Sequence, residues 1–194
     1  MSNLFESLIA RPLAEKMRPT RLELMVGQEH LLAQDAPLGR MLRERRASSM
    51  ILWGPPGSGK TTLAKILAEH VNMHFEPLSA VFSGVSDLRK VFDKALERKK
   101  VGEETLLFVD EIHRFNRAQQ DSFLPFVEDG TVVLIGATTE NPSFELNSAL
   151  LSRCKVFILE KIAKAGLENL VKRAEELEGK ELPLEQRERD ALLS

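Results

Sequence analysis

The chain has 194 residues, of which 43% are hydrophobic and 29% charged, with a formal net charge of −2. This length suffices for one α/β domain and part of a second, and the near-balanced charge argues against a protein that coats nucleic acid. The single cysteine, Cys154, excludes an intrachain disulfide and a cysteine-rich zinc site. Because no apolar run approaches the roughly 18 residues of a membrane-spanning helix, we expect a cytoplasmic protein with no membrane partner.

The first fifty residues read as an irregular arm, interrupted by prolines such as Pro37, and then a helix. Short apolar runs predict strands farther along the chain. One of them, residues 105–109, is continuously apolar, which is typical of a strand buried on both faces of a parallel sheet. The five expected strands are residues 50–53, 75–79, 105–109, 132–137 and 155–159.

Apolar residues at helical spacing predict helices between these strands. We expect Ser86 to cap one helix and Leu96 to lie on its buried face. Residues 116–128 read as a single helix. From about residue 163 the pattern becomes charged and helical, which indicates the beginning of a smaller domain. The alternation of buried strands and helices predicts an α/β fold.

A glycine-rich loop follows the first expected strand and precedes a helix. Its sequence, GPPGSGKT over residues 54–61, fits the G-x-x-x-x-G-K-[ST] pattern completely. Glycines let the backbone N–H groups point at phosphate oxygens, and the helix adds its positive dipole end. Lys60 should reach the β- and γ-phosphates, and Thr61 should ligate Mg²⁺. We therefore expect ATP and Mg²⁺, held by Gly54, Pro55, Pro56, Gly57, Ser58, Gly59, Lys60, Thr61 and Thr62.

Two acidic residues end the strand expected at 105–109. Because unpaired acids are costly to bury, Asp110 and Glu111 should face the ligand at the carboxyl edge of the sheet. Asp110 is placed to hold the magnesium, and Glu111 to orient and deprotonate the attacking water. Acids at strand ends are common by themselves, but the phosphate-binding loop upstream favours the catalytic interpretation.

Hydroxyl residues and an arginine complete the candidate site. A hydroxyl after residues 132–137 can hydrogen-bond the γ-phosphate or the attacking water, with Thr139 as first choice and Thr138 as the alternative. Arg153 stands just before the last expected strand. An exposed arginine is usually only solvated, yet arginine is well suited to stabilise charge on a transferring phosphoryl group.

Together, the loop, the acid pair, GATT at 136–139 and SRC at 152–154 resemble the AAA+ ATPases of the clamp-loader clade. Two longer stretches are similar to one family of that clade, the replication-associated recombination protein A family: HRFNRAQQD at 113–121 and ENPSFELNSALLSR at 140–153. The resemblance implies a P-loop AAA+ fold with a five-stranded parallel sheet sandwiched by helices. Its parts would be an N-terminal arm (1–16), a nucleotide-binding core (17–161) and the beginning of a helical lid (162–194).

The same resemblance implies further roles. Residues 17–19 and 25–30, including Val26, would line the adenine pocket, and Arg153 would enter the ATP site of a neighbouring subunit in a homo-oligomer. Family members are DNA-dependent ATPases at stalled or gapped replication forks, which implies DNA as a partner and a nucleoid-associated protein. Bacterial members also associate with single-stranded-DNA-binding protein. The family pattern continues with more of the lid and an oligomerisation domain, which these residues do not include.

The residues bear on three alternatives to this family. The branch-migration helicase RuvB has a similar acid pair and Gly-Ala-Thr-Thr but inserts a DNA-engaging hairpin between them, for which residues 111–138 leave no room. A clamp-loader subunit shares Ser-Arg-Cys but usually carries Glu-Glu-Pro-Pro where residues 128–131 read EDGT. The third is an ATP-binding switch or scaffold with little turnover. A missing catalytic carboxylate would favour it, but Glu111 is present.

Basic residues suggest where DNA could bind. The ordinary explanation for a crowded basic helix is a solvated polar face, and this applies to Arg89, Lys90, Lys94, Arg98, Lys99 and Lys100. Arg114 and Arg117, which follow the acid pair, are better candidates for a subunit interface or a DNA-facing pore. Trp53 and Cys154 are expected in or near the core, with no chemistry assigned.

Overall fold

A parallel β-sheet organises the chain, which a computed structural model describes over residues 12–182. The outermost parts of the predicted arm and lid, residues 1–11 and 183–194, lie outside the described residues. The strand order is β2-β3-β4-β1-β5, and every neighbouring pair is parallel. The strands are β1 (Met50–Trp53), β2 (His74–Ser79), β3 (Thr105–Asp110), β4 (Val132–Thr138) and β5 (Lys155–Ile158). The predicted five-stranded parallel sheet is confirmed.

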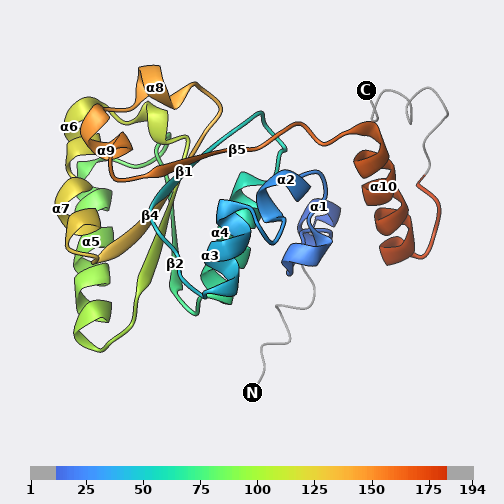
Figure 1. The fold of residues 1–194 in the computed structure, drawn as a ribbon, viewed down its shortest axis with the longest axis horizontal. Coiled ribbons are helices and arrows are strands. Elements are labelled where there is room, and N and C mark those ends of the chain that lie inside the picture. Colours follow the sequence, from blue (N-terminus) through green and yellow to red (C-terminus); the bar gives the residue numbers. More distant parts are fainter. Residues whose placement is uncertain (1–11, 183–194) are drawn as a thin grey trace.

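Helices cover both faces of this sheet. Figure 1 shows α3 (Pro37–Arg43) and α4 (Lys60–His70) on one side and α5 (Val85–Lys100) and α7 (Leu124–Glu128) on the other. The remaining helical segments are α1 (Leu13–Lys16), η1 (Leu22–Leu24), α2 (Glu29–Leu32), η2 (Ile112–Arg114), α6 (Arg117–Asp121), α8 (Pro142–Glu145), α9 (Ser148–Leu151) and α10 (Lys164–Glu178).

Strand β3 shows how the two cores are built. Successive side chains of a strand point to opposite faces, so Leu106 and Phe108 pack in the core beneath α3 and α4, whereas Leu107 and Val109 pack in the core beneath α5. All four are almost completely buried. This confirms the prediction of a strand buried on both faces. Because both faces are covered, polar side chains can reach solvent only where the strand ends, at the carboxyl edge of the sheet.

The first fifty residues contain more helix than predicted. Three short helical segments, α1, η1 and α2, occupy the part that reads as irregular. Pro37 does not interrupt a helix but begins α3, because the fixed φ of proline suits the first helical position and its missing N–H needs no partner there.

The single helix predicted over residues 116–128 is wrong, because the structure contains two short helices. Asn116 caps α6: its Oδ1 accepts from the Gln119 N–H at 2.9 Å, and Gln119 Oε1 accepts from the Asn116 N–H at 3.0 Å. Pro125 explains the break after Asp121. Proline has no N–H to donate to the carbonyl four residues earlier, and its ring crowds that carbonyl.

Two details predicted for α5 are also wrong. The helix begins at Val85 with Gly84 as its N-cap residue, and the Gly84 N–H donates to the Asp87 carboxylate at 3.1 Å, so Ser86 is not the cap. Leu96 is 37% exposed. An α-helix turns about 100° per residue, so Leu96, eight residues after Leu88, lies about 80° around the helix from it. That position is at the edge of the buried face.

The final described helix, α10, confirms the predicted charged helix after residue 163. Figure 1 shows it at the far end of the molecule from α5 and α7. Val171 and Ala174 are buried. Near its end, Glu178 forms an ion pair with Lys16 at 2.9 Å, which joins this helix to the end of α1.

Candidate active site

A cavity of about 600 Å³ opens at the carboxyl edge of the sheet, within the size range of small-molecule sites. The glycine-rich loop, the acid pair after β3 and the end of β4 border it together with the N-terminal segment and α10. Most of the predicted site residues line it, namely Val26, Pro56, Gly57, Ser58, Gly59, Lys60, Thr61, Thr62, Asp110, Glu111 and Thr139.

The glycine-rich loop has the backbone that phosphate binding requires. Gly59 lies in the left-handed region at φ +96° and is the N-cap residue of α4, whose free N–H groups therefore face the cavity. A Cβ built at Gly57, at φ +75°, would meet no atom within 4 Å, so the loop is open there. The buried Ser58 Oγ has no partner within the described chain. This cradle fits a triphosphate.

Lys60 begins α4 and turns back onto the loop. Its Nζ donates to Gly54 O at 2.7 Å and to Pro55 O at 2.9 Å, and the residue is 8% exposed. Gly54 and Pro55 do not line the cavity, but their carbonyls hold this ammonium group. Burial lowers the pKa of Lys60 from its ordinary 10.5, and the negative charges of Glu111 and Asp110 oppose that effect.

The acid pair sits where β3 ends. Asp110 is the last residue of the strand, and Glu111 takes a left-handed conformation at φ 53° and ψ 44°. A non-glycine residue held in such a conformation costs about 1–3 kcal/mol, and such residues cluster at functional sites. The turn directs Glu111 into the same cavity as Lys60 and Asp110.

The end of β4 separates the two candidate hydroxyl residues. Thr139 lines the cavity, and its hydroxyl donates to Glu111 Oε2 at 3.4 Å. Thr138 is fully buried, and its hydroxyl oxygen lies 3.1 Å from Glu140 O and 3.0 Å from Glu140 N. Only Thr139 is therefore placed to reach a ligand in the cavity.

The donor set fits Mg²⁺. Thr61 and Asp110 both line the cavity, and their side chains offer a hydroxyl and a carboxylate oxygen. Magnesium usually keeps several waters and binds one or two protein oxygens together with substrate phosphates. Among residues 12–182, no group of three or more His, Cys, Asp or Glu side chains is arranged to hold a metal ion by itself.

The other half of the cavity is apolar. Val26 and the two predicted segments around Met17 and Met25 lie there. Ile162 and Leu170, which the sequence interpretation did not assign to the site, come from the linker after β5 and from α10. Gly166 permits this packing, because a Cβ there would lie 2.6 Å from Val26 Cγ1. An apolar wall of this kind suits a planar base.

Gln28 connects three segments around the cavity, a role that the sequence interpretation did not assign to it. It is completely buried, its Nε2 donates to Glu160 O at 2.9 Å and to Ser58 O at 3.3 Å, and its Oε1 accepts from the Glu160 N–H at 3.1 Å. One amide thus joins the N-terminal segment, the glycine-rich loop and the linker after β5. No local pattern in the sequence marks this role.

Arg153 is the one predicted catalytic residue that lies away from the cavity. It follows α9, its Nε donates to Glu128 Oε1 at 2.6 Å, and its Nη1 donates to Ala149 O at 2.7 Å. Its side chain is 37% exposed. It is therefore available at the surface and does not contact the P-loop of its own chain.

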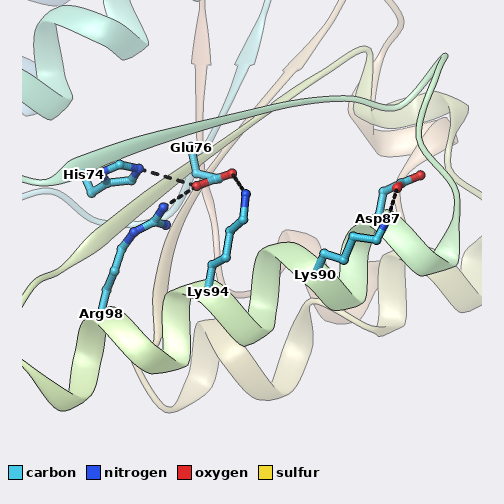
Figure 2. Close-up of polar contacts among 6 residues, drawn as sticks. All are labelled: His74, Glu76, Asp87, Lys90, Lys94 and Arg98. Carbon is cyan, nitrogen blue, oxygen red and sulfur yellow. Dashed lines mark hydrogen bonds and ion pairs between the residues drawn. The ribbon is translucent and has the colours of Figure 1, made fainter.

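Most of the basic side chains of α5 are paired. Figure 2 shows Lys94 and Arg98 directed at Glu76 of β2, with an Arg98 Nη2–Glu76 distance of 2.7 Å. Burial disfavours the charged form of Glu76, but Arg98 and Lys94 outweigh it and lower its pKa below 4.5. Lys90, Lys99 and Lys100 pair with Asp87, Asp129 and Glu97. These contacts support the ordinary explanation of a soluble helix face.

One known protein family matches the part of the chain that carries this site. The model of the AAA family, described as "ATPase family associated with various cellular activities", matches residues 50–161, which include the loop, the acid pair and Thr139. The chain belongs to this family. The AAA+ fold expected from the sequence is therefore confirmed.

Curated relatives confirm the narrower resemblance. "Replication-associated recombination protein A" of Escherichia coli is 51% identical over 91% of this chain and 40% of its own length. "ATPase WRNIP1" of Dictyostelium discoideum is 55% identical over 86% of this chain and 19% of its own length. The chain thus spans about two fifths of the bacterial relative and a smaller share of the larger one.

A solved structure shares the fold. The RuvB Holliday junction branch migration motor of Thermotoga maritima is 31% identical with a TM-score of 0.69, and the match covers 84% of this chain and 55% of that chain. Residues 111–131, which join β3 to β4 here, form only η2, α6 and α7.

Within the described residues, no helix is long and apolar enough to span a bilayer.

Proposed function

We propose that this chain binds Mg²⁺-ATP in the cavity and hydrolyses the γ-phosphate, as the ATPase part of a DNA-acting oligomer in replication-associated recombination. The observation that carries the proposal is Glu111. A carboxylate held in a left-handed turn lines the same cavity as the P-loop lysine and a strand-end aspartate. That combination supports hydrolysis beyond mere binding of ATP.

Each residue has a role that follows from its position. Lys60 exchanges its two loop carbonyls for phosphate oxygens, and the N–H groups at the start of α4 donate to the same phosphates. Thr61 and Asp110 would hold Mg²⁺, which when bound neutralises charge on the phosphate oxygens. Glu111 orients a water and accepts its proton, and Thr139 donates to the γ-phosphate or to that water.

Arg153 is proposed to act on a neighbouring subunit. Its exposed guanidinium on the turn before β5 is suited to a bidentate contact with the phosphates of a second copy. Such an arginine is typically worth 10³–10⁵-fold in turnover where it has been supplied in trans. Hydrolysis would then require a homo-oligomer.

DNA is the proposed stimulator. The relatives are named for replication-associated recombination, and we infer that the chain acts at stalled or gapped replication forks and associates with single-stranded-DNA-binding protein. Arg114 on η2 and Arg117 on α6 support a DNA-facing or subunit-facing surface. Both are exposed, and neither has an ion pair among the described residues.

The test is Mg²⁺-ATP binding and turnover of the full-length protein on forked, gapped and blunt DNA. Glu111→Gln should lower turnover by about 10²- to 10⁴-fold, the range of a general base, and leave ATP binding within about twofold of wild type. Lys60→Ala should weaken binding itself. Tight ATP binding by the wild type with no DNA-stimulated phosphate release would favour the switch or scaffold alternative.

A further inference from the structure

His113 lies directly against the proposed general base. It belongs to η2, the 3₁₀ turn that follows the left-handed Glu111, and its side chain is only 6% exposed. Its Nε2 lies 3.3 Å from Glu111 Oε2, and its Nδ1 lies 2.9 Å from Thr138 Oγ1. The ring therefore bridges the turn after β3 and the end of β4.

Hydrogen-bonding capacity fixes the direction of this bridge. An ionised carboxylate only accepts hydrogen bonds, so Nε2 must carry the hydrogen that points at Glu111. In the neutral imidazole Nδ1 is then an acceptor, and it faces the Thr138 hydroxyl. The N–H of Glu140 donates to that same hydroxyl oxygen at 3.0 Å.

The bridge matters more to Glu111 than to Thr138. The Thr138 hydroxyl has one hydrogen to donate, either to His113 Nδ1 or to Glu140 O, and in both cases it accepts from the Glu140 N–H. Without the imidazole it can therefore still donate to Glu140 O. The Glu111 carboxylate, in contrast, has its contacts only at Oε2, from His113 and from the Thr139 hydroxyl at 3.4 Å. Among the described residues, no side chain donates to Oε1.

We propose that His113 is a positioning residue for hydrolysis. By donating to Oε2 together with Thr139, it fixes the rotation of the Glu111 carboxylate and leaves Oε1 as the oxygen that accepts a proton from water. Because Nδ1 is hydrogen-bonded to the Thr138 hydroxyl, the ring also holds the turn that carries Glu111 against the end of β4, where Thr139 lies. This inference rests on the proposed hydrolytic role of Glu111.

Two amide substitutions of His113 test its contacts with Glu111 and with Thr138 separately. The side-chain amide of glutamine reaches about as far as Nε2, whereas that of asparagine reaches about as far as Nδ1. His113→Gln should therefore keep the donor to Glu111, and His113→Asn should keep only the contact with Thr138. His113→Ala removes both, and the thermal midpoint of each variant shows whether it folds.

The measurements are kcat at saturating Mg²⁺-ATP and the dissociation constant for ATP, in the full-length protein. We expect His113→Ala and His113→Asn to lower kcat by about 10- to 100-fold, the usual effect of a misplaced reacting group, with ATP affinity within about twofold of wild type. His113→Gln should stay within about threefold of wild-type kcat. In a Glu111→Gln background, His113→Ala should cause no further loss.

Several results would overturn the proposal. One is a wild-type kcat in His113→Ala. Another is an equal loss of kcat in folded His113→Gln and His113→Asn. A third is a loss of ATP affinity as large as the loss of kcat. An additive effect in the Glu111→Gln background would also overturn it. If Glu111→Gln retains wild-type turnover, the proposed function itself is wrong. If Glu111→Gln loses turnover as expected but the His113 variants keep wild-type kcat, only the role of His113 is wrong.

Discussion

Arg153 forms an ion pair with Glu128 of its own chain, through both its Nε and its terminal Nη2. The pair joins the end of α7 to the turn before β5, and its side chains are 37% and 50% exposed. An arginine that acts on a neighbouring ATP must first leave this carboxylate. In the proposed oligomer, Glu128 would therefore compete with the phosphate for the same guanidinium.

Glu128→Gln should therefore raise ATP turnover of the oligomer. Exposed ion pairs contribute about 0.2–1 kcal/mol, so the increase should be at most about fivefold, with the ATP dissociation constant unchanged. Arg153→Ala should instead reduce turnover by about 10³-fold or more. Steady-state phosphate release at a protein concentration that saturates assembly measures both.

The matched control is Glu97→Gln, which removes another exposed, ion-paired carboxylate from α5. It should leave turnover unchanged. Should Arg153→Ala turn over ATP as fast as the wild type, Arg153 would have no role in trans and the Glu128 effect would have no basis.

Substitution of the two threonines at the end of β4 should affect different properties, kcat for Thr139 and stability for Thr138. Thr139→Val removes the hydroxyl that faces the cavity and should lower kcat by about 10-fold or more with little change in thermal midpoint. Thr138→Val leaves the part-buried N–H of Glu140 without its side-chain partner and should lower the free energy of unfolding by about 1 kcal/mol.

Comparison of kcat with denaturant unfolding for the two variants distinguishes these outcomes. Thr138→Ser, which keeps the hydroxyl, should retain most of the wild-type stability. The assignment would be wrong if Thr138→Val reduced kcat more than Thr139→Val while both proteins remained equally stable.

The local parts of the site could be predicted because short contiguous patterns encode them. GPPGSGKT places Lys60 and Thr61 by itself, and an apolar strand ending in Asp110 and Glu111 fixes the acid pair. Most of the sheet could be predicted for the same reason, since β1, β3 and β4 are short apolar runs, whereas β2 mixes apolar and polar residues. The helix break near Pro125 is also encoded locally, because proline cannot continue the hydrogen bonding of a helix, although the apolar spacing of residues 116–128 hides it.

The rest of the site depends on contacts between distant residues. Gln28 and Glu160 are 132 residues apart in the chain, and nothing in either local sequence indicates that they meet. His113 is near the acid pair in sequence, but its bridge to Thr138 becomes visible only when β3 and β4 lie side by side. The partner of Arg153 likewise comes from a different helix.

Gln28 leads to a third prediction. Gln28→Ala should leave the part-buried N–H and carbonyl of Glu160 and the buried carbonyl of Ser58 without this partner, and so lower the free energy of unfolding by about 1–3 kcal/mol. It should also weaken ATP binding, because the glycine-rich loop and the linker lose their shared partner. Gln28→Glu keeps the shape but replaces the donor with an acceptor, and should be at least as harmful.

Isothermal titration with ATP and denaturant unfolding test this prediction. His30→Ala is a suitable control, because the His30 ring belongs to the same segment and contacts Ile158 O at an exposed position. A Gln28→Ala protein with wild-type affinity and stability would show that the three segments hold together without the amide.

The basic surface gives the fourth prediction. Arg114 and Arg117 are exposed beside the acid pair without ion pairs among the described residues, whereas Lys94 and Arg98 are engaged by Glu76 (Figure 2). A cation without a carboxylate partner has more to gain from a phosphate. The double substitution of Arg114 and Arg117 by alanine should therefore reduce DNA-stimulated turnover much more than ATP binding.

The matched control neutralises Lys90 and Lys94 together. Because each already has a carboxylate partner at the surface, this variant should keep DNA-stimulated turnover within about twofold of wild type. Phosphate binding by Lys or Arg releases counterions, so the Arg114 and Arg117 variant should also show a shallower salt dependence of DNA binding, by roughly one unit of slope for each phosphate that is no longer neutralised. Equal loss of ATP binding and DNA stimulation would instead mean that these arginines support the nucleotide site, since both effects would then arise from the turn that carries Glu111.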